Sequence, residues 1–152
     1  MYRRGTVIKP KTKALAVAGA AGDKKALDIV LIKMRKMSSV CDYFVIASGT
    51  STTQVGAIAD HIRARLSQKG ERLWHIEGAR EASWILLDFG DVVAHVFLDQ
   101  TRRFYDLERL WCDAPQERFE EEKKPAKRRK RHIPAKKKLP KKKLPKKKKT
   151  RK

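Results

Sequence analysis

The sequence predicts an α/β domain, a mixed five-stranded sheet flanked by helices, that is followed by a polycationic tail. Short apolar runs rich in β-branched residues alternate with segments of helical periodicity, which is typical of this fold class. Residues 123–152 carry 19 basic and no acidic side chains, which separates the tail from the domain. Because the whole chain has a net charge of +21, subtracting the tail's +19 leaves only +2 for residues 1–122.

Three helices are expected in the domain. Residues 12–21 are rich in strong helix formers and favour a short first helix. The clearest helix, 52–69, follows Ser51, which with Gln54 has the spacing of a capping box. Its apolar residues fall on one stripe, as in a helix that covers a sheet. A last amphipathic helix, 104–111, is expected to pack onto the sheet through Leu107, Leu110 and Trp111.

Five apolar runs are the candidate strands. The first two, residues 28–34 and 43–49, are apolar enough to be covered on both faces. The short run 73–77 follows the long helix, and this strand–helix–strand order predicts a right-handed parallel crossover. The last two runs, 83–89 and 92–98, flank a Gly-Asp pair, which predicts a tight turn and an antiparallel hairpin.

Charge and composition set the expected domain boundaries. We expect an N-terminal extension over residues 1–11, the domain over 12–115, and a charged linker and basic tail over 116–152. Residues 117–124 are expected to extend as a charged helix. A block as basic as the tail repels itself and cannot bury a core, so it should stay disordered until it meets a polyanion. No single tail residue, Arg128 included, stands out as a nucleic-acid contact.

Composition and motif spacing exclude several classes of protein. No apolar run approaches the roughly 20 residues that cross a bilayer. The N-terminus has no hydrophobic signal core, so secretion is not expected. Cys41 and Cys112 lie far apart, which favours reduced thiols and a cytoplasmic location. Neither they nor the four histidines have the spacing of a metal site, and we expect no metal and no cofactor.

The run from Trp84 to Asp88 is the strongest candidate for a binding surface. Alternate residues of a strand face opposite sides of a sheet, so Ile85 and Leu87 could fill the core. The other side would then expose an apolar centre with an acidic rim, made by Trp84, Leu86, Asp88 and Asp91. Alternatively, helices cover both faces and the four apolar residues are all core. The residues alone leave both readings open.

Catalytic alternatives depend on few residues. Ser51 follows a strand and could contact a phosphate, with Asp88 or Asp91 holding magnesium, although a plain helix cap also explains this serine. A nucleotide-binding or nucleotidyltransferase enzyme therefore stays an alternative, with no catalytic residue assigned. His95 lacks a neighbouring nucleophile and is more typical of a half-buried histidine than of a general base. Arg102 and Arg103 could bind phosphate or pair with carboxylates of the domain.

Five blocks of the sequence, taken together and in order, resemble the ribosomal silencing factor family, which is also called Iojap-related. The resemblance extends over about residues 12–113, and the Lys/Pro-rich tail is not part of it. The blocks are Asp42-Tyr-Phe-Val-Ile-Ala-Ser-Gly-Thr-Ser51, Gln54-Val-Gly-Ala-Ile-Ala-Asp60, Glu77-Gly78, Trp84-Ile-Leu-Leu-Asp-Phe-Gly-Asp-Val-Val-Ala-His-Val-Phe97 and Arg103-Phe-Tyr-Asp-Leu-Glu-Arg-Leu-Trp111.

This resemblance implies a binding protein whose fold is related to nucleotidyltransferases without their catalytic carboxylates. It implies docking on the L14-type protein of the large ribosomal subunit, which blocks small-subunit joining and represses translation. The implied docking residues are Trp84, Leu86 and Asp88, with Asp91 and His95 as weaker matches. Some members of the family are homodimers when they are free, so a homodimer is an expected state of this chain too. We expect the tail to touch ribosomal RNA, and a general RNA-binding protein acting through that tail is the other alternative.

Overall fold

The structure is a computed structural model and describes residues 8–121. The chain divides into two units, residues 1–122 and residues 123–152. The described residues all belong to the first unit. The expected N-terminal extension lies mostly outside the described residues, and the basic tail and its expected contact with RNA lie wholly outside them.

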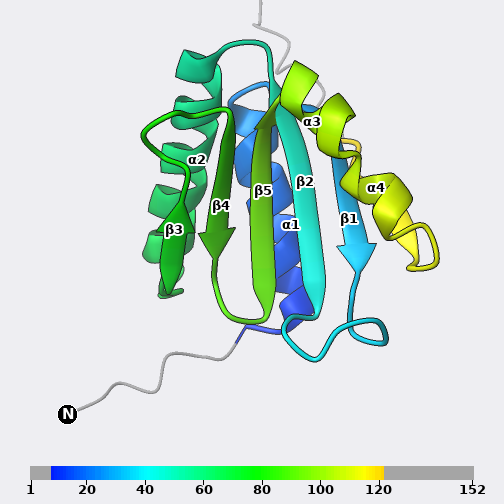
Figure 1. Cartoon of the computed structure of the whole chain (residues 1–152). Coiled ribbons are helices and arrows are strands. Elements are labelled where there is room, and N and C mark those ends of the chain that lie inside the picture. The colour runs from blue at the N-terminus through cyan, green and yellow to red at the C-terminus, as the bar shows by residue number, and fades with distance from the viewer. Residues whose placement is uncertain (1–7, 122–152) are drawn as a thin grey trace, which may run out of the picture. The chain divides into compact units, whose positions relative to one another are not determined.

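The centre of the fold is a six-stranded mixed sheet with the strand order β3-β4-β5-β2-β1-β6 (Figure 1). β2 and β5 pair in parallel, whereas every other neighbouring pair is antiparallel. The mixed α/β class is therefore as predicted, with one strand more than expected. The strands are β1 Leu27–Lys33, β2 Tyr43–Gly49, β3 His75–Glu77, β4 Trp84–Asp88, β5 Val92–Leu98 and β6 Gln116–Arg118.

The sixth strand corrects two predictions. A charged helix over residues 117–124 is wrong, and the sheet continues beyond the expected domain end at residue 115, because β6 pairs antiparallel with β1. Phe119 then donates its amide hydrogen to the Ile29 carbonyl at 2.8 Å. All three residues of β6 are exposed. The strand therefore forms because the edge of β1 offers unpaired backbone groups, not because β6 has apolar side chains to bury.

Helices cover the two faces of the sheet unequally. α1 (Pro10–Asp23) and α2 (Thr52–Gln68) lie across one face, behind the sheet in Figure 1. α3 (Asp99–Tyr105) and α4 (Leu107–Leu110) lie on the opposite face, beside β2 and β1. Within the described part of the chain, no helix lies in front of β4 on this second face (Figure 1).

Each face of the sheet has its own hydrophobic cluster. The cluster under α1 and α2 is almost entirely aliphatic, and its members include Val17, Ile58, Leu66, Ile85 and Leu87. The cluster on the second face is built around Ile32, Ile46 and Phe97. Several partly buried side chains complete this second cluster, namely Phe44, Trp84, Leu86, Leu107 and Trp111.

The cap of α2 differs in one detail from the predicted capping box. The Ser51 hydroxyl accepts a hydrogen bond from the Gln54 amide at 3.1 Å, as expected. The Gln54 side chain, however, accepts from the Thr50 amide at 2.8 Å, one residue before the expected partner. The helix then ends before Gly70, whose φ of +80° is the left-handed conformation that favours glycine.

The last predicted helix is wrong in its extent. Instead of one helix over 104–111, α3 begins at Asp99 and a separate α4 follows it. The break falls at Asp106, whose φ of +46° is left-handed and stops the first helix. As a result Leu110 points into solvent, 68% exposed, while Leu107 and Trp111 pack on the second cluster as predicted.

The crossover and the hairpin have the predicted directions. β3 runs in the same direction as β2, but β4 and β5 lie between them, which puts β3 at the edge of the sheet. β4 and β5 form the antiparallel hairpin, whose turn contains Gly90 with a φ of +89°. Over residues 8–121, no helix is both long and apolar enough to cross a membrane.

Candidate partner-binding site

The alternation predicted for β4 is present. Ile85 and Leu87 are 2% and 0% exposed and belong to the cluster under α1 and α2. Trp84, Leu86 and Asp88 point to the second face and are only half buried. The reading in which all four apolar residues are core is therefore wrong, because Trp84 and Leu86 stay partly exposed on the second face.

Trp84 is held in a fixed position although it is half exposed. Its indole Nε1 donates a hydrogen bond to His95 Nδ1 at 3.1 Å. Its ring stacks on Phe97, with ring centroids 4.8 Å apart, and tilts against Tyr105, also at 4.8 Å. A large aromatic side chain that is held in place before binding loses little conformational entropy on contact with a partner. This arrangement suits a protein-binding anchor.

His95 is buried behind Trp84 and does not reach the surface. It is 4% exposed and packs edge-on against Phe44 at 4.7 Å. Burial lowers the pKa of the His95 imidazole from 6.5 to about 4, so the ring is neutral at pH 7. Because Nδ1 accepts from Trp84, the proton of the neutral ring lies on Nε2, and Nε2 has no hydrogen-bond partner among residues 8–121.

A glycine next to β3 lets the chain approach Trp84 closely. Gly78 has a φ of +77°, and a Cβ atom at this position would lie 2.0 Å from the Trp84 carbonyl oxygen. Only a residue without a side chain therefore fits here without moving the backbone of β4. Gly78 lies in the short Glu77-Gly78 block of the resemblance, but the sequence alone gave no physical role to it.

The two predicted acidic residues do not lie together. Asp88 lies on the second face, where its Oδ1 accepts from the Gly90 amide at 2.8 Å. Asp91 lies in the β4–β5 turn and forms an ion pair with Lys13 of α1. Lys13 also pairs with Glu71 at 2.7 Å, so it links α1 to two other segments. The structure thus brings Trp84, Leu86, Asp88 and His95 together on the hairpin and turns the Asp91 carboxylate toward α1.

A second acid on this face was missed by the sequence prediction. Glu77 of β3 lies directly opposite Leu86 of β4, so its side chain is on the same face as Trp84. Its Oε1 lies 2.8 Å from Nε2 of His75, which is opposite Asp88. The strand register was needed to find it, because β3 has only three residues.

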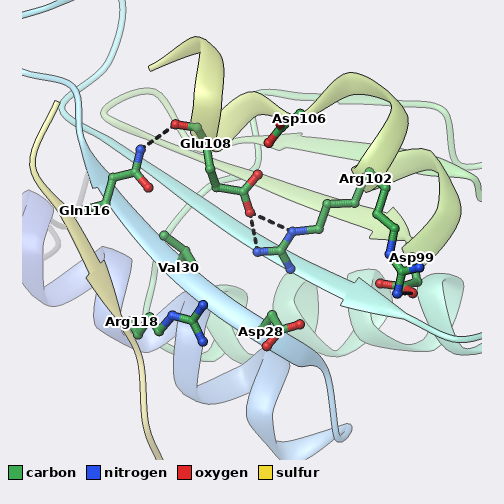
Figure 2. Close-up of a pocket in the computed structure, with 9 residues that line it drawn as sticks. Asp28, Val30, Asp99, Arg102, Asp106, Glu108, Gln116 and Arg118 are labelled. Carbon is green, nitrogen blue, oxygen red and sulfur yellow. Dashed lines mark hydrogen bonds and ion pairs between the residues drawn. The ribbon is translucent and has the colours of Figure 1, made fainter. Parts of the chain in front are cut away.

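The hollow drawn in Figure 2 lies between β1, β6 and the last two helices and has a volume of about 450 Å³. Its buried Arg102 donates to Glu108 at 2.8 Å and to the Ser48 hydroxyl at 2.8 Å. Arg103 pairs with Asp99 at 2.8 Å. These arginines therefore pair with groups of the domain, which was one of the two readings of the sequence, and Arg102 links α3 to α4 and to β2.

The residues of the catalytic alternative lie at opposite ends of the sheet. Ser51 follows the carboxyl end of β2, whereas Asp88 and Asp91 flank the turn before β5. In the parallel register of β2 and β5, Tyr43 is opposite Val92 and Gly49 opposite Leu98. Seven residues of strand span about 20 Å, so the serine cannot share a substrate atom with either carboxylate. Over residues 8–121, no three His, Cys, Asp or Glu side chains converge on one point.

A small mixed α/β domain with a half-exposed, fixed tryptophan on an incompletely covered sheet face is the kind of domain that binds another macromolecule. Comparison with known proteins identifies the family. The family model described as "Ribosomal silencing factor during starvation" matches residues 8–144, a longer span than the 12–113 of the resemblance. The chain therefore belongs to the ribosomal silencing factor family.

Individual relatives agree with this assignment. The ribosomal silencing factor of Bacillus subtilis is 47% identical over 64% of this chain and 83% of its own length. The ribosomal silencing factor of Halalkalibacterium halodurans is 43% identical over 63% of this chain and 82% of its own length. A crystal structure of a Chromobacterium violaceum protein superposes with a TM-score of 0.68 and 30% identity, covering 78% of this chain and 98% of that one.

Proposed function

We propose that this ribosomal silencing factor docks on the L14-type protein of the large ribosomal subunit and thereby blocks small-subunit joining. The fixed, half-exposed Trp84 is the observation that supports this proposal most strongly. Leu86 beside it adds apolar area, and Asp88 and Glu77 add negative charge that suits a basic ribosomal protein. Inhibition requires only that the bound protein occupy the volume of the joining subunit, so no reaction is needed.

A protein that acts by binding alone needs no catalytic site, and we expect none in this fold. We expect it to be related to nucleotidyltransferases and to lack their paired metal-binding carboxylates. The separation of Ser51 from Asp88 and Asp91 supports that expectation. Titration of the full chain with ATP and magnesium in a calorimeter should give no heat of binding, whereas a micromolar site would favour the enzyme alternative.

Within the docking face, His95 acts as a positioning residue. It is too deeply buried to touch a partner, but its Nδ1 accepts the only side-chain hydrogen bond that the Trp84 indole makes to residues 8–121. Its neutral state is what makes this possible, since an imidazolium has no free acceptor nitrogen. His95 thus sets the orientation in which Trp84 meets the ribosomal protein.

Two further expectations concern the rest of the chain and its oligomeric state. The basic tail, residues 123–152, would touch ribosomal RNA and raise the effective concentration of the docked domain. Deleting it should weaken subunit binding and flatten the salt dependence. In the free protein, the same apolar face would pair two copies, so Trp84→Ala should shift the sedimentation equilibrium toward monomer.

The experiment compares two tryptophan variants of the full chain. Trp84→Ala should lose co-sedimentation with purified large subunits and should no longer prevent small subunits from joining. Trp74→Ala is the matched control, because Trp74 is 70% exposed and lies just before β3. Equal binding by wild-type chain and Trp84→Ala would refute docking through this face and favour an RNA-binding protein that acts through its tail.

A further inference from the structure

A second hollow lies at the lower end of the sheet in Figure 1, where α1 begins, β1 ends and β2 begins. It has a volume of about 310 Å³. Three separate segments of the chain line it. The lining residues are Lys9, Pro10 and Lys11, then Lys33 and Arg35, and finally Asp42 and Tyr43. We name it the basic pocket, and we propose that it binds the phosphate backbone of RNA.

The charge of the basic pocket is the first argument. Four basic side chains and one acidic side chain give it a formal charge of +3. All of residues 1–122 together carry only +2, so the remainder of that unit is net negative. The pocket is therefore a local excess of positive charge in a domain that is nearly neutral as a whole. A site of this kind attracts polyanions.

The second argument is that these cations are free to bind. Lys9, Lys11 and Lys33 are exposed and form no ion pair with any residue of the described range 8–121. Arg35 is 78% exposed and lies 3.9 Å from Asp42, at the limit of an ion pair. In the hollow of Figure 2, by contrast, Arg102 and Arg103 are both paired.

The third argument concerns the chemical class of the ligand. Half-buried Tyr43 lines the pocket among the basic side chains. Basic side chains interleaved with an aromatic ring are typical of sites that follow a nucleic-acid backbone and stack a base. Isolated small anions would meet the charge but would not use the ring.

The basic pocket borders the turn of the Trp84 hairpin. The Asp91 carbonyl accepts hydrogen bonds from the amides of Asp42 at 2.7 Å and Tyr43 at 3.2 Å. Asp91 follows Asp88 by only three residues, so a wall of the pocket is bonded to the turn of the Trp84 hairpin. The inference rests on the proposed function, because a domain docked on a ribosomal protein has ribosomal RNA within reach. It is independent of the tail.

The test uses two full-length triple variants with the same change in charge. Lys9→Gln/Lys11→Gln/Lys33→Gln removes three charges from the pocket. Arg63→Gln/Lys69→Gln/Arg80→Gln removes three exposed charges elsewhere that also form no ion pair within residues 8–121. Affinity for purified large subunits is measured over a range of salt concentrations. The pocket variant should bind at least about tenfold more weakly at low salt, with a log–log salt slope lower by about 2–3.

Two additional measurements identify the ligand. Replacing the same three lysines by arginine should restore binding. Ultraviolet cross-linking of the wild-type complex should place an RNA adduct on the tryptic peptide 37–63, which contains Tyr43. If the pocket variant binds more weakly but the wild-type complex gives no such adduct, the ligand is an acidic protein surface and not RNA. Equal salt slopes for the two triple variants would show that the pocket is not a binding site. Normal binding by Trp84→Ala would refute the proposed docking but would leave the pocket untouched. The two hypotheses can therefore fail separately.

Discussion

The two faces of the sheet use the same strands for different purposes. On the face under α1 and α2, aliphatic side chains such as Leu87 are fully buried and packed in a continuous cluster. On the other face, aromatic and polar side chains such as Trp84 and His95 meet, and part of the surface is left open. Because successive residues of a strand face opposite sides, one five-residue strand, β4, contributes both to the buried core and to the open surface.

The difference is clearest in the hydrogen bonds. Within residues 8–121, the single buried side-chain nitrogen or oxygen without a partner is Nε2 of His95, on the open face. A buried polar group without a partner costs on the order of 1–3 kcal/mol of stability. A fold that was optimised for stability alone would place an apolar side chain there.

The largest expected difference is between neighbouring leucines of β4. Leu87→Ala should lower the free energy of unfolding by about 2–5 kcal/mol, because it leaves a cavity in the covered face. Leu86→Ala, on the half-buried face, should cost less than about 1.5 kcal/mol and should weaken binding to large subunits. Urea denaturation and subunit sedimentation of both variants measure the two effects. Equal loss of stability in the two variants would contradict the division between faces.

A pair of glycine substitutions tests how the backbone holds Trp84. Gly70→Ala and Gly78→Ala both place alanine at a φ near +80°, which should cost about 1–2 kcal/mol. Only at Gly78 would the new Cβ collide with the Trp84 carbonyl, whereas at Gly70 no atom lies within 4 Å. Gly78→Ala should therefore lose more stability and also lose subunit binding. The explanation fails if thermal unfolding and sedimentation do not separate the two variants.

The ion pairs of Lys13 tie α1 to the hairpin turn and should be visible in alkaline solution. Burial alone would lower the pKa of Lys13, but hydrogen bonds to Asp91 and Glu71 outweigh it and the pKa is raised above 10.5. Folding therefore favours the protonated lysine. Its contribution is fully present below about pH 10.5 and is lost as the pH rises through the higher value in the folded protein. Lys13→Met should cost about 1–3 kcal/mol at pH 7 and remove this alkaline decline.

The smallest effect on stability is expected at His95. His95→Leu should leave the free energy of unfolding within about 1 kcal/mol or raise it, because the unpaired Nε2 disappears, while subunit binding falls. His95→Gln, whose amide oxygen can accept from Trp84, should retain more binding than His95→Leu. If His95→Leu binds large subunits as well as the wild-type chain does, the Trp84–His95 hydrogen bond has no positioning role.

The same variant should alter the response to acid. Because the pKa of His95 is lowered from 6.5 to about 4, the unfolded chain binds more protons than the folded chain between these values. The contribution of His95 to stability is therefore complete above about pH 6.5 and falls toward pH 4, by at most about 1.4 kcal/mol per pH unit. Urea denaturation at several pH values in this range should show that the free energy of unfolding depends less on pH in His95→Leu than in the wild-type chain.

Local patterns in the sequence predicted much of the fold. The start of α2, the extent of β2 and the β4–β5 hairpin each depend on residues close together in the chain, such as Ser51 with Gln54. β6 could not be predicted in this way, because it has no apolar pattern and depends on the free edge of β1. The break at Asp106 was missed because neither glycine nor proline marks it.

The candidate site was predictable in part. Alternation along β4 indicated Trp84 and Leu86 as outward residues, and the structure places both on the open face. The role of His95 could not be found, because it depends on the register between β4 and β5. Asp91 pairs with Lys13, which lies 78 residues away in the sequence. The basic pocket was missed for the same reason, since three distant segments form it.

We propose above all that the Trp84 face of the sheet binds a protein of the large ribosomal subunit. An electron cryo-microscopy map of large subunits saturated with the full chain tests it most directly. We predict that the Trp84 indole, together with Leu86, lies against the L14-type protein on the surface where the small subunit joins. A map in which that face points into solvent while another surface of the chain makes the contact would contradict the account.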